Sequence, residues 1–493
     1  MIVVRPAADN WNKMGDYDPI ILENAEQTHK WHIASINDWI ETSNNTNSIA
    51  RCNISTLKYS IYNIRKQYDD VDIIWNTCSE SVVFIHKDEA EILDNFICGR
   101  TIEACEYSFI EKLFIQGILV LKEDDEISKL HFIRLRSITN TSAIKSFIIL
   151  PTTACNARCF YCFAHQDLKV SHKMTYETAD DVLEFIYSRV KNGDEIVFRW
   201  FGGEPLMADD IIDYIVDNVN SHYQGDIKYH SIITTNASLL TESLLERAIE
   251  KWHLRKIQIP LDGYKNEHNR RKNYRESQKG DYDHYDQIIN RIEALLNRGI
   301  YTTCRLNLDY SNVSNIDGIL NDLSKFKDDK RFFLHAIPLH TPKNTDTIGK
   351  YVYFTEYGEF YTHVYGKLVK AGFLTNLNRI LPKRAMSVCT AMLNNFALIN
   401  SDGYLYRCDQ ELHIPENSVG TCKTGIIHNK NLQKWLDPTI PLECEECEFL
   451  PICQGGCKFY RFRNDPSLKP CVEHKFISSL LLDIAYSLFY KQQ

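Results

Sequence analysis

The chain has 493 residues, of which 44% are hydrophobic and 25% are charged, and its formal net charge is −9. This composition is that of an ordinary globular protein of about two to four domains, and the acidic balance excludes nucleic acid as the main partner. No apolar run approaches the roughly 18 residues of a membrane span, and the N-terminus lacks the apolar stretch of a signal peptide. Sixteen cysteines, most of them in two groups, therefore predict metal-binding thiols in a cytoplasmic protein without a membrane partner.

Residues 1–145 predict a small α+β domain. Ser81–His86 and Ile118–Leu121 are typical of strands, and Ala104–Gln116 is typical of a helix that ends at Gly117. This order fits a winged-helix-like module or a plain cap on the next domain, and the pattern favours neither.

Residues 146–340 alternate strand and helix six times. The predicted strands are Phe147–Leu150, Glu195–Trp200, His230–Thr235, Lys256–Leu261, Thr302–Asp309 and Arg331–Leu339. The predicted helices run from Ala179 to Val190 and near Asp210–His222, Thr241–Trp252, Tyr285–Arg298 and Asn315–Phe326. Such alternation indicates an α/β fold with a parallel sheet and right-handed crossovers. Six units are too few for a closed eight-fold barrel, so we expect a partial (β/α)6 TIM-like barrel.

Cys155, Cys159 and Cys162 directly follow the first of these strands, where barrels of this kind carry their functional loops. A four-iron cluster takes four thiolate ligands, so three leave one iron open to another ligand. A structural zinc loop, or three unrelated buried cysteines, would give the same residues.

Gly202, Gly203 and Glu204 follow the second strand, within Trp-Phe-Gly-Gly-Glu-Pro. Two glycines allow a ligand to approach the backbone closely, and a carboxylate accepts hydrogen bonds from an ammonium group. Taken alone, the same residues are typical of a turn.

Together, the cysteine spacing and the Gly-Gly-Glu-Pro sequence resemble the radical S-adenosylmethionine (SAM) superfamily. The resemblance implies a [4Fe-4S] cluster whose free iron binds SAM, and cleavage of SAM to a 5′-deoxyadenosyl radical. It also implies that Glu204 holds the methionyl amine, and that Tyr161 packs beside the cluster or the adenine. Several of the polar residues at the later strands would reach the ribose or carboxylate of SAM, from among Asn236, Gln258, Asp262 and Arg305. Each of them is alternatively a core or turn residue.

Residues 341–388 are expected to link the barrel to a second cysteine-rich region, with one helix near Thr355–Lys370. Residues 389–471 carry that region, and residues 472–493 predict an amphipathic C-terminal helix. Its cysteines are Cys389, Cys408, Cys444, Cys447, Cys453, Cys457 and Cys471. In this order they resemble the SPASM extension, which implies a C-terminal iron–sulfur domain with two auxiliary [4Fe-4S] clusters. A zinc ribbon would account for Cys444–Cys457, but not for Cys389, Cys408 and Cys471.

The resemblance divides these cysteines between two clusters. Cys444, Cys447, Cys453 and Cys471 would hold the outer cluster. Cys389, Cys408 and Cys457 would hold the inner one, which leaves it with three ligands. Either Cys422 completes the inner cluster, or its fourth iron is open and takes a substrate thiolate. Asp409, next to Cys408, matches a catalytic base of sulfatase maturases, or merely turns the chain.

The resemblance covers residues 146–471 strongly and 1–145 weakly. The leading hypothesis is a peptide maturase that crosslinks a precursor peptide by a thioether or carbon–carbon bond. The N-terminal domain would then bind the leader of that peptide, and a flavodoxin or ferredoxin would donate electrons. The alternatives are formylglycine formation in a sulfatase, and a non-catalytic electron-transfer or peptide-binding iron–sulfur protein.

Overall fold

The computed structural model describes residues 1–3, 53–139, 144–162, 171–275, 283–339, 352, 356–375, 377–385, 388–412, 414–463 and 471–490. The chain forms two compact units. The terminal unit contains Met1–Thr139, Leu374–Cys389 and Pro438–Gln493, and the central unit contains Asn140–Phe373 and Thr390–Asp437. None of the helices in the described part of the chain has both the length and the apolar character needed to cross a membrane.

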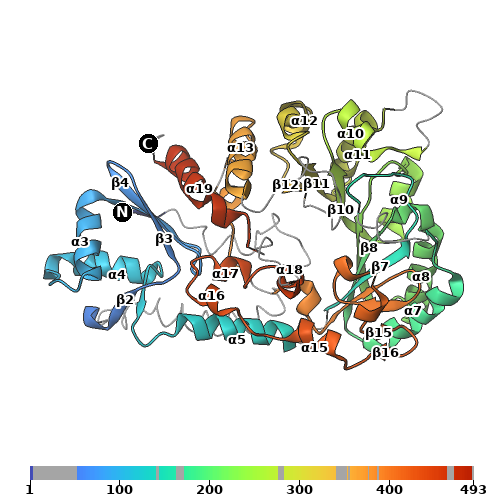
Figure 1. Ribbon diagram of the computed structural model, residues 1–493, viewed down its shortest axis with the longest axis horizontal. Helices are drawn as coiled ribbons and strands as arrows, with labels where there is room; N and C mark the ends of the chain where they lie inside the picture. Colours follow the sequence, from blue (N-terminus) through green and yellow to red (C-terminus); the bar gives the residue numbers. More distant parts are fainter. Residues whose placement is uncertain are drawn as a thin grey trace. The chain divides into compact units, whose positions relative to one another are not determined.

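A ten-stranded sheet forms the centre of the central unit (Figure 1). Its first six strands lie side by side in chain order, and every neighbouring pair is parallel. They are β7 (Ile144–Thr152), β8 (Glu195–Gly202), β9 (Lys228–Thr234), β10 (Leu254–Leu261), β11 (Tyr301–Leu308) and β12 (Phe332–Pro338). The predicted α/β fold with a central parallel sheet is confirmed, and this sequential order is the one that a partial barrel requires.

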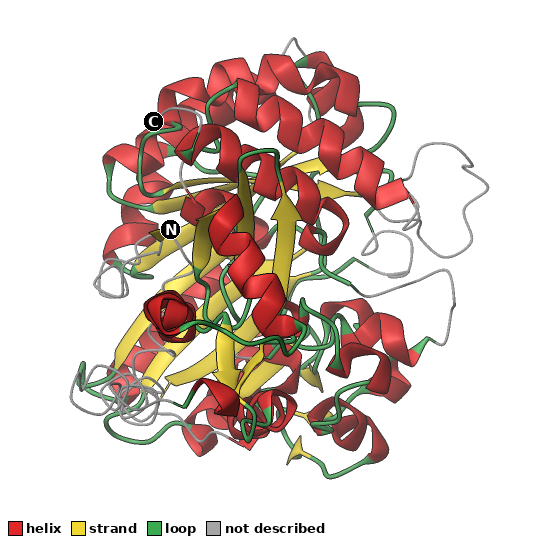
Figure 2. Ribbon diagram, turned by 90° about the vertical axis from the view of Figure 1, so that its left-hand side faces the viewer, coloured by secondary structure: helices red, strands yellow, loops and turns green. Residues whose placement is uncertain are grey.

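Amphipathic helices connect these strands and pack against the sheet (Figure 2). In α7 (Tyr176–Arg189), Ala179, Val182 and Ile186 recur at helical spacing and are buried, and Thr175 caps the first turn. The other helices are α8 (Asp209–His222), α9 (Glu242–Glu250), α10 (Asn266–Lys272), α11 (His284–Asn297), α12 (Ile316–Leu323) and α13 (Tyr357–Lys370). Sequence patterns predicted all of them except the short helix α10.

Four further strands extend this sheet beyond β7. β13 (Phe396–Ile399) is parallel to β7, with Phe396 opposite Ser146 and Ile399 opposite Ile149. An antiparallel series follows: β14 (Tyr404–Tyr406), β15 (Gly420–Thr421) and β16 (Gly425–Ile426), and then helix α15 (Lys430–Leu436). Four apolar residues form too short a pattern for the sequence to have predicted that β13 joins the barrel sheet.

The terminal unit contains an antiparallel sheet with the strand order β1-β5-β4-β3. Its strands are β1 (Ile2–Val3), β3 (Asn63–Gln67), β4 (Val71–Asn76) and β5 (Val82–His86). A second pair joins β2 (Leu57–Tyr59) to β6 (Leu119–Leu121). The helices are α3 (Lys87–Ile97), α4 (Tyr107–Ile115) and α5 (Glu126–Thr139). A 3₁₀ turn precedes α4, so the single helix predicted there is two elements. The winged-helix assignment stays a prediction, because residues 4–52 lie outside the described part.

The rest of the terminal unit consists of short helices and one long one. They are α14 (Leu377–Ile380), α16 (Leu442–Glu445), α17 (Leu450–Cys453), α18 (Lys458–Phe462) and α19 (His474–Phe489). Helix α19 packs on the sheet, because Tyr486 stacks on Tyr68 and Lys66 pairs with Asp483 at 2.6 Å. The predicted domain boundaries at residues 146, 341, 389 and 472 stay predictions.

Candidate functional site

The three cysteines predicted to hold the first cluster lie in the loop after β7. All three thiols are partly buried. The loop is compact: the amide of Ala157 donates to Cys155 Sγ at 3.4 Å, and that of Cys162 donates to the carbonyl of Cys159 at 3.1 Å. Burial, with a smaller contribution from neighbouring thiols, raises the pKa of Cys155 to about 11 and that of Cys159 to about 12. A positive metal centre relieves such mutual repulsion, so this donor set suits an iron–sulfur cluster.

The two glycines after β8 lie against the backbone that leads into this loop. A Cβ atom at Gly203 would lie 2.2 Å from the carbonyl oxygen of Ala154, and Gly202 has a φ of +126°. The amide of Gly203 donates to the carbonyl of Thr152 at 3.1 Å, and that of Glu204 donates to Ala154 at 2.8 Å. Both positions therefore require glycine, since any side chain would push the cysteine loop away.

Glu204 is fully buried beside the cysteine loop. Its Oε1 accepts hydrogen bonds from Thr235 Oγ1 at 2.6 Å and from the amide of Leu206 at 3.1 Å, and its Oε2 accepts one from the amide of Asn236 at 2.8 Å. Burial raises the pKa of this carboxyl above its ordinary value. These three donors leave Oε2 with acceptor capacity for one more.

Asn236 links the end of β9 to the cysteine loop. Its Nδ2 lies 3.9 Å from Cys155 Sγ and 2.9 Å from Asn156 Oδ1. Asn156 in turn donates to Ser238 Oγ at 2.8 Å. The structure thus brings Asn236 into contact with the cysteine loop, and its predicted contact with SAM stays a prediction.

Tyr161 and Asp262 are joined by a buried polar network. The phenol of Tyr161 donates to Asp262 Oδ2 at 2.6 Å, and Asn307 Nδ2 donates to Asp262 Oδ1 at 3.0 Å. Lys272 completes the network: its Nζ lies 3.1 Å from Asp262 Oδ2 and 3.2 Å from the phenol oxygen. The cation is the reason why the pKa of Asp262 is lowered in spite of burial, which acts in the opposite direction.

Sequence patterns did not single out Lys272. It ends α10 within Arg-Arg-Lys, and a basic last turn is typical of a solvated helix end. Its neighbour Arg271 is also buried, pairs with Asp309 at 2.8 Å, and stacks over Phe160. Only the placement of α10 against the cysteine loop, where Arg158 donates its amide to the carbonyl of Lys272 at 2.7 Å, reveals the role of these cations.

Gln258 and Arg305 lie on neighbouring strands. Gln258 is paired with Thr303 in the register, and the two-residue period of β11 places Thr303, Arg305 and Asn307 on one face. Arg305 Nε and Asn307 Oδ1 are buried, and neither has a hydrogen-bond partner among the described residues. Buried polar atoms of this kind need a partner, and a polar ligand such as SAM would supply one.

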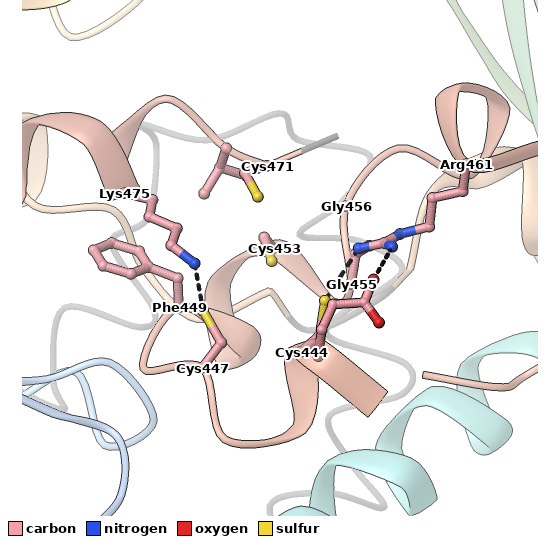
Figure 3. Close-up of a pocket in the computed structure, with 11 residues that line it drawn as sticks. Cys444, Cys447, Phe449, Cys453, Gly455, Gly456, Arg461, Cys471 and Lys475 are labelled. Atoms are coloured by element: carbon pink, nitrogen blue, oxygen red, sulfur yellow. Dashed lines mark hydrogen bonds and ion pairs between the residues drawn. The ribbon is translucent and has the colours of Figure 1, made fainter. Parts of the chain in front are cut away.

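The four cysteines assigned to the outer cluster line one cavity in the terminal unit (Figure 3). They are Cys444, Cys447, Cys453 and Cys471. The cavity has a volume of about 230 Å³, and Gly455, Gly456, Arg461 and Lys475 also line it. Burial, with a smaller contribution from the charges of the other three thiols, raises the pKa of Cys453 to about 11. Four converging thiols with neighbouring cations fit a four-iron cluster, although the cluster itself remains a proposal.

The three cysteines assigned to the inner cluster belong to different units. Cys389 and Cys457 are exposed residues of the terminal unit, whereas Cys408 belongs to the central unit. The thiol of Cys408 donates to Asp409 Oδ1 at 3.5 Å. The grouping of these three cysteines, and the role of Asp409, stay predictions.

Cys422 lies at the opposite end of the β14–β15 hairpin from Cys408. Because Tyr404 pairs with Thr421, Cys422 is placed opposite Gly403, before β14 begins, and its amide donates to the Gly403 carbonyl at 2.8 Å. Cys408 follows the end of β14, so about 10 Å of strand or more separates the two positions. Burial raises the pKa of Cys422 to about 12. This placement does not support Cys422 as a ligand shared with Cys408.

Comparisons with known proteins agree with this site. The Radical SAM superfamily pattern matches residues 149–323, which span β8 to β11 and include the cysteine loop. A cysteine-type anaerobic sulfatase-maturating enzyme of Clostridium perfringens is 25% identical over 356 residues, covering 65% of this chain and 91% of that protein. The radical SAM cyclopropyl synthase TigE of Paramaledivibacter caminithermalis is 23% identical over 82% of this chain and 84% of its own length.

Two further comparisons concern a shorter match and a solved structure. An uncharacterized protein of Methanocaldococcus jannaschii is 32% identical over 121 residues, which are 24% of this chain and only 39% of that protein. Among solved structures, native anSMEcpe with bound AdoMet and Cp18Cys peptide has a TM-score of 0.53 at 17% identity, covering 70% of this chain and 99% of that one. This likeness supports the fold. The pattern match shows a radical SAM domain over residues 149–323, and the longer matches show that the chain is similar to radical SAM enzymes.

Proposed function

We propose that this enzyme is a peptide maturase that installs a crosslink in a precursor peptide. The observation that carries the proposal is the part of the chain that its sulfatase-maturating relatives lack. The match to the Clostridium perfringens enzyme covers 91% of that protein but only 65% of this chain, so about a third of this chain is additional. An additional module suits an enzyme that must recognise a second segment of its substrate, such as a leader.

The antiparallel sheet of the terminal unit offers a place for that segment. Strand β3 ends the strand order β1-β5-β4-β3, and in the described part of the chain it pairs with β4 alone. Extended peptides bind such edges by adding a strand through main-chain hydrogen bonds. Four of the five β3 residues are half-buried, so their side chains would contribute to specificity.

In the central unit, Cys155, Cys159 and Cys162 would hold the cluster, and Gly202 and Gly203 let SAM approach the backbone. When bound, the cluster and SAM supply the 5′-deoxyadenosyl radical that takes a hydrogen atom from an unactivated position. Glu204 Oε2 would accept a hydrogen bond from the methionyl ammonium. Arg305, whose Nε lacks a partner in the described structure, would bind the SAM carboxylate or ribose. The network around Asp262 fixes the side chain of Tyr161, which belongs to this loop.

A thioether is the crosslink that the cysteines favour. Because Cys422 lies at the far end of the hairpin from Cys408, the inner set would have three ligands, Cys389, Cys408 and Cys457, and an open iron would be free to bind a peptide thiolate. The second candidate is formylglycine formation, which the sulfatase-maturating relatives favour and in which Asp409 would act as the base. Under either function, a flavodoxin or ferredoxin would be the electron donor.

Mass spectrometry of a short cysteine-containing peptide encoded beside the enzyme, co-expressed with and without it, tests the proposal. A crosslink removes two hydrogen atoms from the peptide, and iodoacetamide then fails to alkylate one cysteine. An unmodified peptide, together with conversion of a neighbouring sulfatase, would contradict peptide crosslinking and support formylglycine formation. A reduced, reconstituted protein that releases no 5′-deoxyadenosine would contradict both.

A further inference from the structure

Two cations donate hydrogen bonds to sulfurs of the outer cysteine set. Arg461 Nη2 lies 3.0 Å from Cys444 Sγ, and Lys475 Nζ lies 3.3 Å from Cys447 Sγ (Figure 3). Arg461 comes from α18 and Lys475 from α19, so the two approach the cavity from separate elements. Neither residue was singled out by the sequence, in which both are ordinary basic residues near cysteines.

Arg461 is held in place by partners other than sulfur. Its Nε donates to the carbonyl of Gly455 at 2.6 Å, and its Nη1 pairs with Glu443 at 2.7 Å. Gly455 has a φ of +83° in the turn after α17, a conformation that glycine adopts readily and that sets the direction of this carbonyl. With three of its nitrogens engaged and only 22% of its side chain exposed, Arg461 is fixed toward Cys444.

Lys475 is more exposed, and its hydrogen bond to Cys447 is its main anchor. Its ammonium group donates to the Cys447 sulfur at 3.3 Å, but with more screening by solvent than Arg461.

Hydrogen bonds to cluster sulfurs are one of the means by which proteins set cluster potentials. Reduction adds a negative charge, and a cation that donates to a ligand sulfur stabilises the reduced state more than the oxidised one. Both cations should therefore raise the reduction potential, and the more buried Arg461 should have the larger effect.

We propose that Arg461 and Lys475 are positioning residues that set the reduction potential of the outer cluster and keep it easy to reduce. The inference rests on the proposed function, because it requires Cys444, Cys447, Cys453 and Cys471 to hold a four-iron cluster. A readily reduced outer cluster suits a reaction in which the peptide gives up an electron when the new bond forms.

A redox titration of the reconstituted full-length enzyme, monitored by electron paramagnetic resonance, tests this inference. The signal that is absent in Cys453→Ala identifies the outer cluster. We expect Arg461→Gln and Lys475→Gln each to shift its midpoint potential to more negative values, with the larger shift for Arg461→Gln. The charge-conserving Lys475→Arg should stay close to the wild type. Lys66→Met is the matched control, because it removes one cation that anchors α19 through Ser479 and Asp483 but contacts no sulfur.

The outcomes separate this inference from the proposed function. If Cys453→Ala contains as much iron as the wild type, the outer cluster is absent and the inference fails, whereas the proposed function is judged by modification of the peptide. If iron falls in Cys453→Ala but the double variant Arg461→Gln/Lys475→Gln keeps the wild-type potential, the inference alone is overturned. It is also overturned if Lys66→Met shifts the potential as far as Lys475→Gln, since the effect would then come from the loosening of α19.

Discussion

Lys272 and Asp262 form an ion pair of 3.1 Å in which only 3% and 0% of the two side chains are exposed. Both members of the pair contact the phenol of Tyr161, and the pair joins α10 to the end of β10. A buried pair of this kind is costly to break, because the remaining charge is left in a medium that cannot solvate it. The pair therefore links the free energy of unfolding to the position of the cysteine loop.

Removal of one partner should be strongly destabilising. We expect Lys272→Met to lower the free energy of unfolding by about 3–5 kcal/mol, measured by urea denaturation of the apoprotein. Lys325→Met, which breaks an exposed pair with Glu293, is the matched control and should cost about 1 kcal/mol or less. An equal loss in the two variants would show that burial contributes nothing to the pair.

The loss in free energy of unfolding caused by Lys272→Met should also be constant around neutral pH. The pKa of Asp262 is lowered and that of Lys272 is raised, in both cases because the partner charge outweighs burial. The contribution of Asp262 is present above its unfolded pKa of about 4 and is lost as pH falls through the lower folded value. That of Lys272 is present below about 10.4 and is lost as pH rises through the higher folded value. Denaturation at several pH values between these limits should give the same difference, and a steady change across neutral pH would contradict the assignment.

The close contact between Gly203 and the backbone of Ala154 predicts that a side chain at residue 203 disrupts the cysteine loop. This effect comes from the contact and not from the helix or strand propensity of the new residue. A methyl group at Gly203 would lie 2.2 Å from the Ala154 carbonyl oxygen, so Gly203→Ala should displace the cysteine loop and abolish SAM cleavage. Gly366→Ala in α13 is the control: nothing lies within 4 Å of its added methyl group, and activity should be unchanged. Formation of 5′-deoxyadenosine and iron content report the result, and an active Gly203→Ala enzyme would refute the role of this contact.

The first cluster and the outer cluster should be separable by cysteine substitution. Cys159→Ala should abolish 5′-deoxyadenosine formation, because the iron that binds SAM is lost with the cluster. Cys453→Ala should lower the iron content but leave some SAM cleavage that is not coupled to peptide modification. Retained turnover in Cys159→Ala would contradict the first assignment, and unchanged iron in Cys453→Ala would contradict the second.

Cys422→Ser should leave the iron content and the modification of the peptide unchanged. Its thiol lies beside Gly403 at the far end of β14 from Cys408, where it cannot share a ligand set with that residue. Iron analysis of the purified variant, with Cys408→Ser as the comparison, checks this. Loss of iron in Cys422→Ser equal to that in Cys408→Ser would restore Cys422 as the fourth ligand of the inner cluster.

The six parallel strands and most helices of the central unit were predictable because their apolar residues recur at regular spacing over seven or more residues. The cysteine loop was predictable because its place after the first strand follows from the fold. The position of Cys422 depends on the register of a hairpin with two- and three-residue strands, which no local pattern encodes. The functional placement of Lys272 and Arg271 could not be predicted for a different reason. Their burial comes from the placement of α10, whereas a short basic helix normally lies in solvent.

The pairing of β13 with β7 has a practical consequence for engineering. Phe396–Ile399 covers the outer edge of the strand that delivers Cys155, although about 250 residues separate them in the sequence. A truncation or chimera cut at residue 389 would strip that edge and expose its amide and carbonyl groups, which favour aggregation between molecules. A shortened protein intended to isolate the SAM-binding half should therefore retain the chain as far as Asp437, where the central unit ends.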